Sequence, residues 1–214
     1  MTAASSARRI GVWGASGSGK SSYVKRATKG RRRVVVFDPL DEYGPLCRVR
    51  VETVDAVRAA MRADWSGFRI AYVPPAGQEP RALSQLCRLL IAAQAPFKMT
   101  GKGAGLTLIV EELNLSFPVS GGEAKCTGFA EICSRGRHYG IEVYGLSQRI
   151  AEVATRFRGN CTETVVLRQQ GPRDLKAATD AIGGHKDAIA ALRDLDYLHE
   201  RGGTVTPGRL NPGR

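Results

Sequence analysis

The residues from Gly14 to Ser21 combine glycines, a lysine and a hydroxyl side chain in a spacing that suits phosphate binding. The segment reads GASGSGKS and matches the phosphate-loop pattern G-x-x-x-x-G-K-[ST] at every fixed position. Glycines allow the backbone to wrap closely around a phosphate, so that successive N–H groups point at its oxygens. We therefore predict that this segment binds a nucleoside triphosphate, the alternative being a glycine- and serine-rich turn with a chance lysine.

Each residue of the predicted loop has an expected role. Lys20 is expected to reach the β- and γ-phosphates, and the Ser21 hydroxyl to ligate Mg²⁺. ATP and Mg²⁺ are therefore the expected cofactors. The predicted nucleotide-binding residues are Gly14, Ala15, Ser16, Gly17, Ser18, Gly19, Lys20, Ser21 and Ser22.

A second group of chemical residues follows the apolar run 106–110, LTLIV, which predicts a buried strand. Glu111 and Glu112 come directly after this run, and the carboxyl ends of strands in open α/β sheets are where ligands bind. Glu111 is expected to orient Mg²⁺, as a Walker-B carboxylate does, although an aspartate is usual there. Glu112 is expected to polarise an attacking water, which favours hydrolysis over phosphate transfer. Two solvated glutamates at the start of a loop are the alternative.

Two further side chains are candidates on chemical grounds. Gln148 ends the next predicted strand, where its amide either contacts the γ-phosphate and reports its loss to a neighbouring subunit or is a plain strand-end amide. Arg137 precedes that strand, and arginine stabilises charge on a transferring phosphoryl group, often from an adjacent subunit. A solvated basic helix end is the alternative for Arg137, and Arg135 is the next candidate for the same role.

The elements that must position these residues alternate between strand and helix patterns, which predicts an α/β fold with a mostly parallel central sheet covered by helices on both faces. The strand before the phosphate loop and the helix after it direct the positive end of the helix dipole at the loop. The expected strands are 10–13, 34–37, 68–73, 106–110, 141–146, 164–167 and 197–199. The expected helices are 21–28, 53–63, 80–95, 123–137, 174–182 and 185–192.

Length and composition favour one soluble domain. The chain has 214 residues, and no apolar run approaches the roughly 20 residues of a membrane span. We expect a flexible lead at 1–8, a single P-loop ATPase domain at 9–206 and a flexible basic tail at 207–214. The cysteines are odd in number and scattered along the chain, which fits neither a disulfide framework nor a zinc site. A cytoplasmic location is expected.

The chain resembles the FtsK–HerA superfamily of DNA-pumping ATPases. The resemblance rests on the phosphate loop, the Walker-B strand, the segments 137–141 and 146–149, and the pair of segments 36–39 and 42–43. It implies a RecA/FtsK–HerA-like core. Because the chain is short, it is most similar to the genome-packaging ATPases of membrane-containing icosahedral viruses with double jelly-roll capsids.

This resemblance implies a homo-oligomeric ring, a hexamer, that pumps double-stranded DNA into a preformed capsid. It also implies capsid-vertex or membrane-associated packaging proteins as partners, and a location in the host cytoplasm and at a packaging vertex of the virion. The net charge of +12 suits sequence-nonspecific binding of phosphates, although a coding bias toward arginine is the alternative. Lys98, Lys102 and Lys125 are the candidate DNA contacts.

Other functions remain open from the sequence. A cellular HerA-like or conjugative translocase core, or the ATPase domain of a filamentous-phage assembly protein, fits the same motifs. A small-molecule P-loop kinase is the alternative from another class. It is disfavoured because no arginine-bearing lid is evident and because Glu111 and Glu112 are paired.

Overall fold

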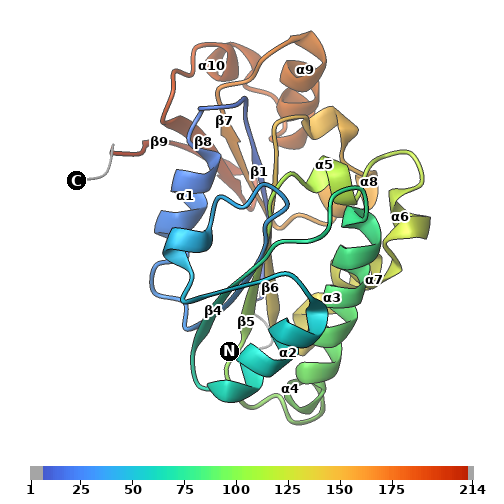
Figure 1. The fold of residues 1–214 in the computed structure, drawn as a ribbon. Coiled ribbons are helices and arrows are strands. Elements are labelled where there is room, and N and C mark those ends of the chain that lie inside the picture. The colour runs from blue at the N-terminus through green and yellow to red at the C-terminus, as the bar shows by residue number, and fades with distance from the viewer. Residues whose placement is uncertain (1–6, 212–214) are drawn as a thin grey trace.

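One mixed sheet organises the protein. The computed structural model describes residues 7–211, and within them nine strands lie in the order β3-β4-β2-β5-β6-β1-β7-β8-β9 (Figure 1). The strands are β1 Arg9–Trp13, β2 Arg33–Phe37, β3 Val49–Val51, β4 Phe68–Tyr72, β5 Leu106–Val110, β6 Ile141–Ser147, β7 Glu163–Leu167, β8 Asp196–Arg201 and β9 Thr204–Arg209. Strands β1 to β7 pair in parallel, whereas β8 and β9 pair antiparallel, which confirms a mostly parallel sheet.

Helices connect the parallel strands, as crossover connections require. The α-helices are α1 Lys20–Ala27, α2 Val54–Ala63, α3 Glu79–Ala93, α4 Ala95–Thr100, α5 Leu113–Ser116, α6 Gly122–Lys125, α7 Thr127–Arg135, α8 Thr155–Arg158, α9 Pro172–Ala181 and α10 Lys186–Ala190. Short 3₁₀ helices are η2 Gly44–Leu46, η3 Gly136–Tyr139 and η4 Ile150–Glu152.

Both faces of the sheet are buried, because alternate residues of each central strand point to opposite sides. On one face, Val35 and Leu108 belong to the large core that α2, α3 and α7 help to form. On the other, Val34 and Ile109 share a smaller core with Val24 of α1. The predicted cover of helices on both faces is confirmed, and it is thicker on the side of α2, α3 and α7.

Some predicted helices differ from those observed. The Thr53 side chain accepts a hydrogen bond from the Ala56 N–H at 3.1 Å and caps α2, where the sequence places a helix start. The single helix predicted at 123–137 is wrong. It is divided at Cys126, whose φ of −125° and ψ of 58° lie outside the helical region, and its last turn is the 3₁₀ helix η3.

The C-terminal boundary also differs from the prediction. Residues 207–209 belong to β9, and the Leu210 side chain is buried. The expected flexible tail is therefore wrong for 207–210, because the hairpin of β8 and β9 extends the sheet there. Residues 212–214 of the expected tail lie outside the described residues.

The end of the expected flexible lead carries an ion pair. Residues 1–6 lie outside the described residues, but the Arg8 guanidinium contacts Glu142 at 2.8 Å and Glu163 at 3.0 Å. Both carboxylates are buried at the start of β6 and β7, the strands on either side of β1. Arg8 thus ties the segment before β1 to β6 and β7. Among residues 7–211, no helix has the length and apolar character needed to cross a bilayer.

Candidate nucleotide-binding site

The predicted phosphate loop connects the end of β1 to the start of α1. Gly17 and Gly19 have φ angles of 73° and 106°, which L side chains rarely adopt, so these two glycines permit the turn. Helix α1 begins at Lys20, and its first N–H groups therefore face the loop. Ser16 and Gly17 are exposed at the tip of the loop, where a phosphate has access.

Lys20 lies against the loop that it is expected to serve. Its Nζ donates hydrogen bonds to the carbonyls of Gly14 at 2.9 Å and Ala15 at 3.2 Å, and the side chain is buried. Burial lowers the pKa of Lys20, while the nearby carboxylates of Glu112 and Glu111 oppose this shift. The charge of Lys20 therefore interacts with the charges of both glutamates.

The hairpin of β8 and β9 covers the back of the loop. The Leu195 N–H donates to the Ser18 carbonyl at 3.0 Å, and the Leu210 N–H donates to the Leu195 carbonyl at 2.8 Å. A Cβ added to Gly19 would lie 3.0 Å from the Leu195 side chain and 3.2 Å from that of Leu210. The C-terminal strands thus hold the loop in place, which the sequence analysis did not predict.

Glu111 lies beside Ser21, as expected of a magnesium site. The Ser21 hydroxyl donates to Glu111 Oε1 at 2.9 Å, and these oxygens are ligands that Mg²⁺ prefers. Burial raises the pKa of Glu111, and the hydrogen bonds from Tyr43 and Ser21 oppose that rise. A cation that contacted both oxygens would offset the cost of burying the carboxylate, so these residues fit Mg²⁺.

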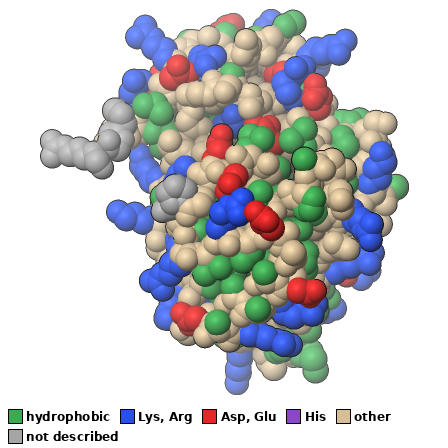
Figure 2. All heavy atoms as spheres, in the orientation of Figure 1, with side chains coloured by type: hydrophobic (Ala, Val, Ile, Leu, Met, Phe, Trp, Pro, Cys, Tyr) green, Lys and Arg blue, Asp and Glu red, His purple; other side chains and the backbone are tan. Residues whose placement is uncertain are grey.

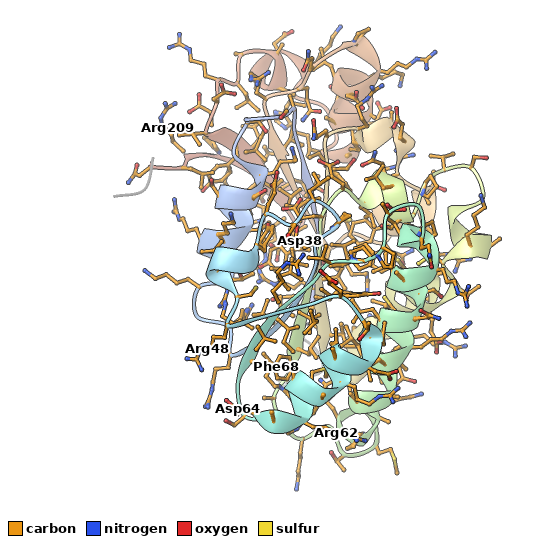
Figure 3. The ribbon with its side chains drawn as sticks, in the orientation of Figure 1. Asp38, Arg48, Arg62, Asp64, Phe68 and Arg209 are labelled. Atoms are coloured by element: carbon orange, nitrogen blue, oxygen red, sulfur yellow. The ribbon has the colours of Figure 1, made fainter. Side chains whose placement is uncertain are left out.

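Tyr43 is a site residue that the sequence analysis did not single out. Its hydroxyl donates to the same Glu111 Oε1 at 2.5 Å, and the side chain is buried. Asp38, fully buried after β2, accepts hydrogen bonds from the N–H groups of Glu42 at 3.0 Å and Tyr43 at 2.8 Å (Figure 3). The loop after β2 therefore delivers Tyr43 to the carboxylate. The resemblance at 36–39 and 42–43 is the only signal that indicated this loop.

Glu112 and Gln148 meet across neighbouring strands. Strand β6 lies between β1 and β5, so its carboxyl end lies between the phosphate loop and the two glutamates. The Gln148 amide donates to Glu112 Oε1 at 2.6 Å. Glu112 has a φ of 43°, an uncommon left-handed conformation for a residue with a side chain. This geometry turns the two adjacent glutamates toward different partners.

Arg137 lies at the opposite end of the parallel strands from these residues. It is exposed in η3, just before β6, whereas the phosphate loop follows the carboxyl end of the parallel strand β1. Arg135 is likewise exposed, near the end of α7. Neither arginine is therefore brought to the phosphate loop of its own chain, and the action of Arg137 on an adjacent subunit stays a prediction.

A different arginine contacts the loop. Arg168 follows β7, and its guanidinium donates to the Ser16 carbonyl at 3.1 Å and to Asp194 at 2.6 Å. Its charge is close enough to help lower the pKa of Lys20. This contact is not predictable from local sequence patterns, because Arg168 and Ser16 are 152 residues apart.

The parallel sheet, the phosphate loop after β1 and the glutamates after β5 together define the chain as a P-loop NTPase. No protein-family model and no curated protein sequence matches the chain.

Solved structures do match it. The genome-packaging NTPase B204 of Sulfolobus turreted icosahedral virus 2, in complex with ATP-γS, superposes with a TM-score of 0.75 at 15% identity and covers 98% of each chain. VirB4 of Thermoanaerobacter pseudethanolicus gives a TM-score of 0.69 at 13% identity, over 96% of this chain and 90% of that one. The pCW3 conjugation coupling protein TcpA gives a TM-score of 0.59 at 14% identity, over 95% of this chain and 60% of that one. These matches show that the chain shares the fold of these proteins.

Proposed function

We propose that this protein is an ATPase that translocates double-stranded DNA, and that it packages a viral genome into a preformed capsid. The observation that carries the proposal is the match, over nearly the full length of both chains, to a structure described as a genome-packaging NTPase. The arrangement of Lys20, Glu111 and Glu112 around one loop supports ATP hydrolysis as the source of energy.

Each side chain of the site then has a distinct part in hydrolysis. Lys20 binds the β- and γ-phosphates and supplies positive charge to them. Ser21 and Glu111 would hold Mg²⁺, which would neutralise charge on the phosphate oxygens. Glu112 accepts a proton from the attacking water. Gln148, which contacts Glu112 at 2.6 Å, responds in this proposal when the γ-phosphate leaves.

We propose that the motor acts as a homo-oligomeric ring, a hexamer. Arg137 is exposed before the amino end of β6, away from its own loop at the carboxyl end of β1, so it would complete the site of an adjacent subunit. Capsid-vertex or membrane-associated packaging proteins are the proposed partners. The host cytoplasm and the packaging vertex of the virion are the proposed locations.

The match to VirB4 and TcpA favours a second candidate, the core of a conjugative DNA translocase. Both candidates move DNA, so they share the site chemistry and differ in the partner that receives the DNA. A gene for a major capsid protein next to the gene for this chain would favour packaging. Genes for a conjugation apparatus in that place would favour the second candidate.

ATP hydrolysis measured with and without duplex DNA tests the proposal. We expect DNA to stimulate hydrolysis, with similar stimulation by unrelated sequences and less as salt rises from about 50 to 200 mM. Lys20→Ala should abolish hydrolysis while its circular dichroism spectrum stays that of the parent. Phosphate transfer to a nucleoside, with no response to DNA, would instead support a small-molecule kinase.

A further inference from the structure

A basic surface surrounds the end of α1 and the turn that leads to β2. Two adjoining hollows, of about 360 and 330 Å³, share Lys29 and Arg69 in their linings. Asp64 is the one carboxylate among the residues that line them. The cations of this basic surface are Lys25, Arg26, Lys29, Arg31, Arg32, Arg48 and Arg69.

The structure holds part of this surface in place. Arg69 on β4 donates hydrogen bonds to the carbonyls of Thr28 at 3.2 Å and Arg31 at 3.3 Å, which ties the turn after α1 to the sheet. Arg31 contacts the buried carboxylate of Glu142 at 2.9 Å. These contacts fix the backbone that carries the surrounding cations, so their charges have a defined spacing.

Three of the remaining cations are open to a ligand. Lys29, Arg32 and Arg48 are exposed and form no ion pair among residues 7–211. Figure 3 places Arg48 beside Asp64 and Phe68 at the lower left of the molecule, and Figure 2 shows blue side chains along that margin. Exposed cations that are not paired with carboxylates attract polyanions.

We propose that the basic surface binds the phosphate backbone of the DNA duplex. This inference rests on the proposed function, which makes duplex DNA the partner. The hollows are too small for a duplex but large enough for individual phosphate groups, so contacts to the backbone are expected and base readout is not. The surface differs from the lysines that the sequence analysis favoured, Lys98, Lys102 and Lys125.

Helix α1 links this surface to the nucleotide site. The helix begins at Lys20 in the phosphate loop and ends at Ala27, next to Lys29, over a length of about 12 Å. A phosphate at one end and DNA at the other would therefore contact the same rigid element. A shift of α1 on hydrolysis would move the DNA contacts, and DNA binding would in turn bias the loop.

The test measures DNA affinity as a function of salt for Lys29→Ala/Arg32→Ala. Each phosphate contact contributes about 0.9 to the slope of log K against log salt, so the slope should become shallower by about 2. Stimulation of hydrolysis by DNA should be lost, whereas hydrolysis without DNA should equal that of the parent. The single variant Arg48→Ala should reduce the slope by about 1.

A matched control removes the same charge elsewhere. Arg173→Ala/Lys186→Ala changes two exposed cations on α9 and α10, which lie at the opposite end of the molecule in Figure 1. We expect it to keep the parental slope and stimulation. A third variant, Lys98→Ala/Lys102→Ala, tests the sequence-based candidates, and a slope change there with none at Lys29 and Arg32 would overturn the proposal.

Failure of the inference and failure of the proposed function have different outcomes. If the parent binds DNA and Lys29→Ala/Arg32→Ala retains its slope, the inference is wrong and the motor function stands. If the parent neither binds duplex DNA nor responds to it, the proposed function is wrong as well. If this variant loses binding to phosphatidylserine vesicles but not to DNA, the basic surface is a membrane contact and the proposal is overturned.

Discussion

The two adjacent glutamates after β5 show how neighbouring residues acquire different chemistry. Glu111 faces Ser21 and Tyr43, whereas Glu112 faces Gln148. The left-handed backbone at Glu112, with a φ of 43°, produces this divergence. A carboxylate held by two hydroxyl groups suits a metal, and one beside a single amide is freer to accept a proton from water.

Glu112→Gln is expected to bind ATP but to hydrolyse it about 10²–10⁴-fold more slowly, because an amide keeps the shape of the side chain but does not act as a general base. Glu111→Gln should mainly weaken the dependence of nucleotide binding on Mg²⁺. Steady-state hydrolysis and binding of a fluorescent ATP analogue measure the two effects. Parental hydrolysis by Glu112→Gln, with slow hydrolysis by Glu111→Gln, would require the two roles to be exchanged.

Tyr43 is expected to orient Glu111 without touching the nucleotide. Tyr43→Phe removes only the hydroxyl that donates to Glu111, and loss of a partner that orients a metal ligand typically weakens metal affinity 10–100-fold. We expect at least a tenfold higher Mg²⁺ concentration for half-maximal binding of the ATP analogue. Tyr72→Phe, at a buried tyrosine that packs on Phe37, should leave this concentration unchanged. Equal values for both variants would exclude the orienting role.

At the scale of elements, the contact between α3 and α7 depends on a glycine. A Cβ added to Gly128 would lie 2.2 Å from the Ser84 carbonyl oxygen, which belongs to the backbone of α3. The Gly128 N–H also donates to the Ser84 hydroxyl at 2.9 Å. The two helices therefore approach more closely than a larger residue would allow.

Gly128→Ala should destabilise the protein by about 1–3 kcal/mol, because the backbone of α3 must move to admit the methyl group. The direction of the change in stability is informative, because alanine stabilises an isolated helix by about 1 kcal/mol relative to glycine. Urea unfolding followed by circular dichroism measures the change. Gly30→Ala, where nothing lies within 4 Å of the added Cβ, is the control and should stay close to the parent. Equal midpoints for the two variants would contradict the tight contact.

The elements that local patterns reveal were predicted, and those that depend on distant contacts were not. The apolar strand β5 and the phosphate loop have signals within about ten residues. Strand β9 was missed because Pro207 and Gly208 normally interrupt strands; at the edge of the sheet, proline is tolerated. Gly208 is needed there, since a Cβ would lie 2.3 Å from the Tyr197 ring.

In the candidate site too, residues within local motifs were predicted and residues joined by distant contacts were not. The sequence predicted Ser21 and Glu111 as a pair because each belongs to a motif, and the structure brings them together. It did not predict Tyr43, whose contact with Glu111 joins residues 68 positions apart through an irregular loop. That loop is ordered by the buried carboxylate of Asp38, and such burial is not visible in the sequence.

At the scale of the whole molecule, the nucleotide site and Arg137 lie at opposite ends of the parallel strands. The carboxyl end of β1 carries the phosphate loop, and the residues before β6 carry Arg137. A single chain therefore carries the phosphate loop of one proposed composite site and, at the other end of its strands, the arginine of another. Such an arrangement gives a ring a site at every junction between subunits.

Mixing two inactive variants tests this arrangement. Arg137→Ala and Lys20→Ala should each reduce hydrolysis, by about 10³–10⁵-fold for a lost arginine finger. Mixed rings should recover partial activity, since some junctions combine an intact loop with an intact Arg137. Hydrolysis is measured after the mixed assembly is verified by native mass spectrometry. No recovery in verified mixed rings would count against action on the adjacent subunit and make Arg135 the next residue to test.

The hairpin of β8 and β9 determines how the protein can be handled in the laboratory. Leu195 and Leu210 pack against Gly19, so the last strand supports the phosphate loop from behind. An expression clone that stopped at residue 206 would cut β9 in half and remove Leu210 from this contact. Affinity tags are better fused after residue 211, and limited proteolysis that trims the chain before Leu210 should cost nucleotide binding before it costs the rest of the sheet.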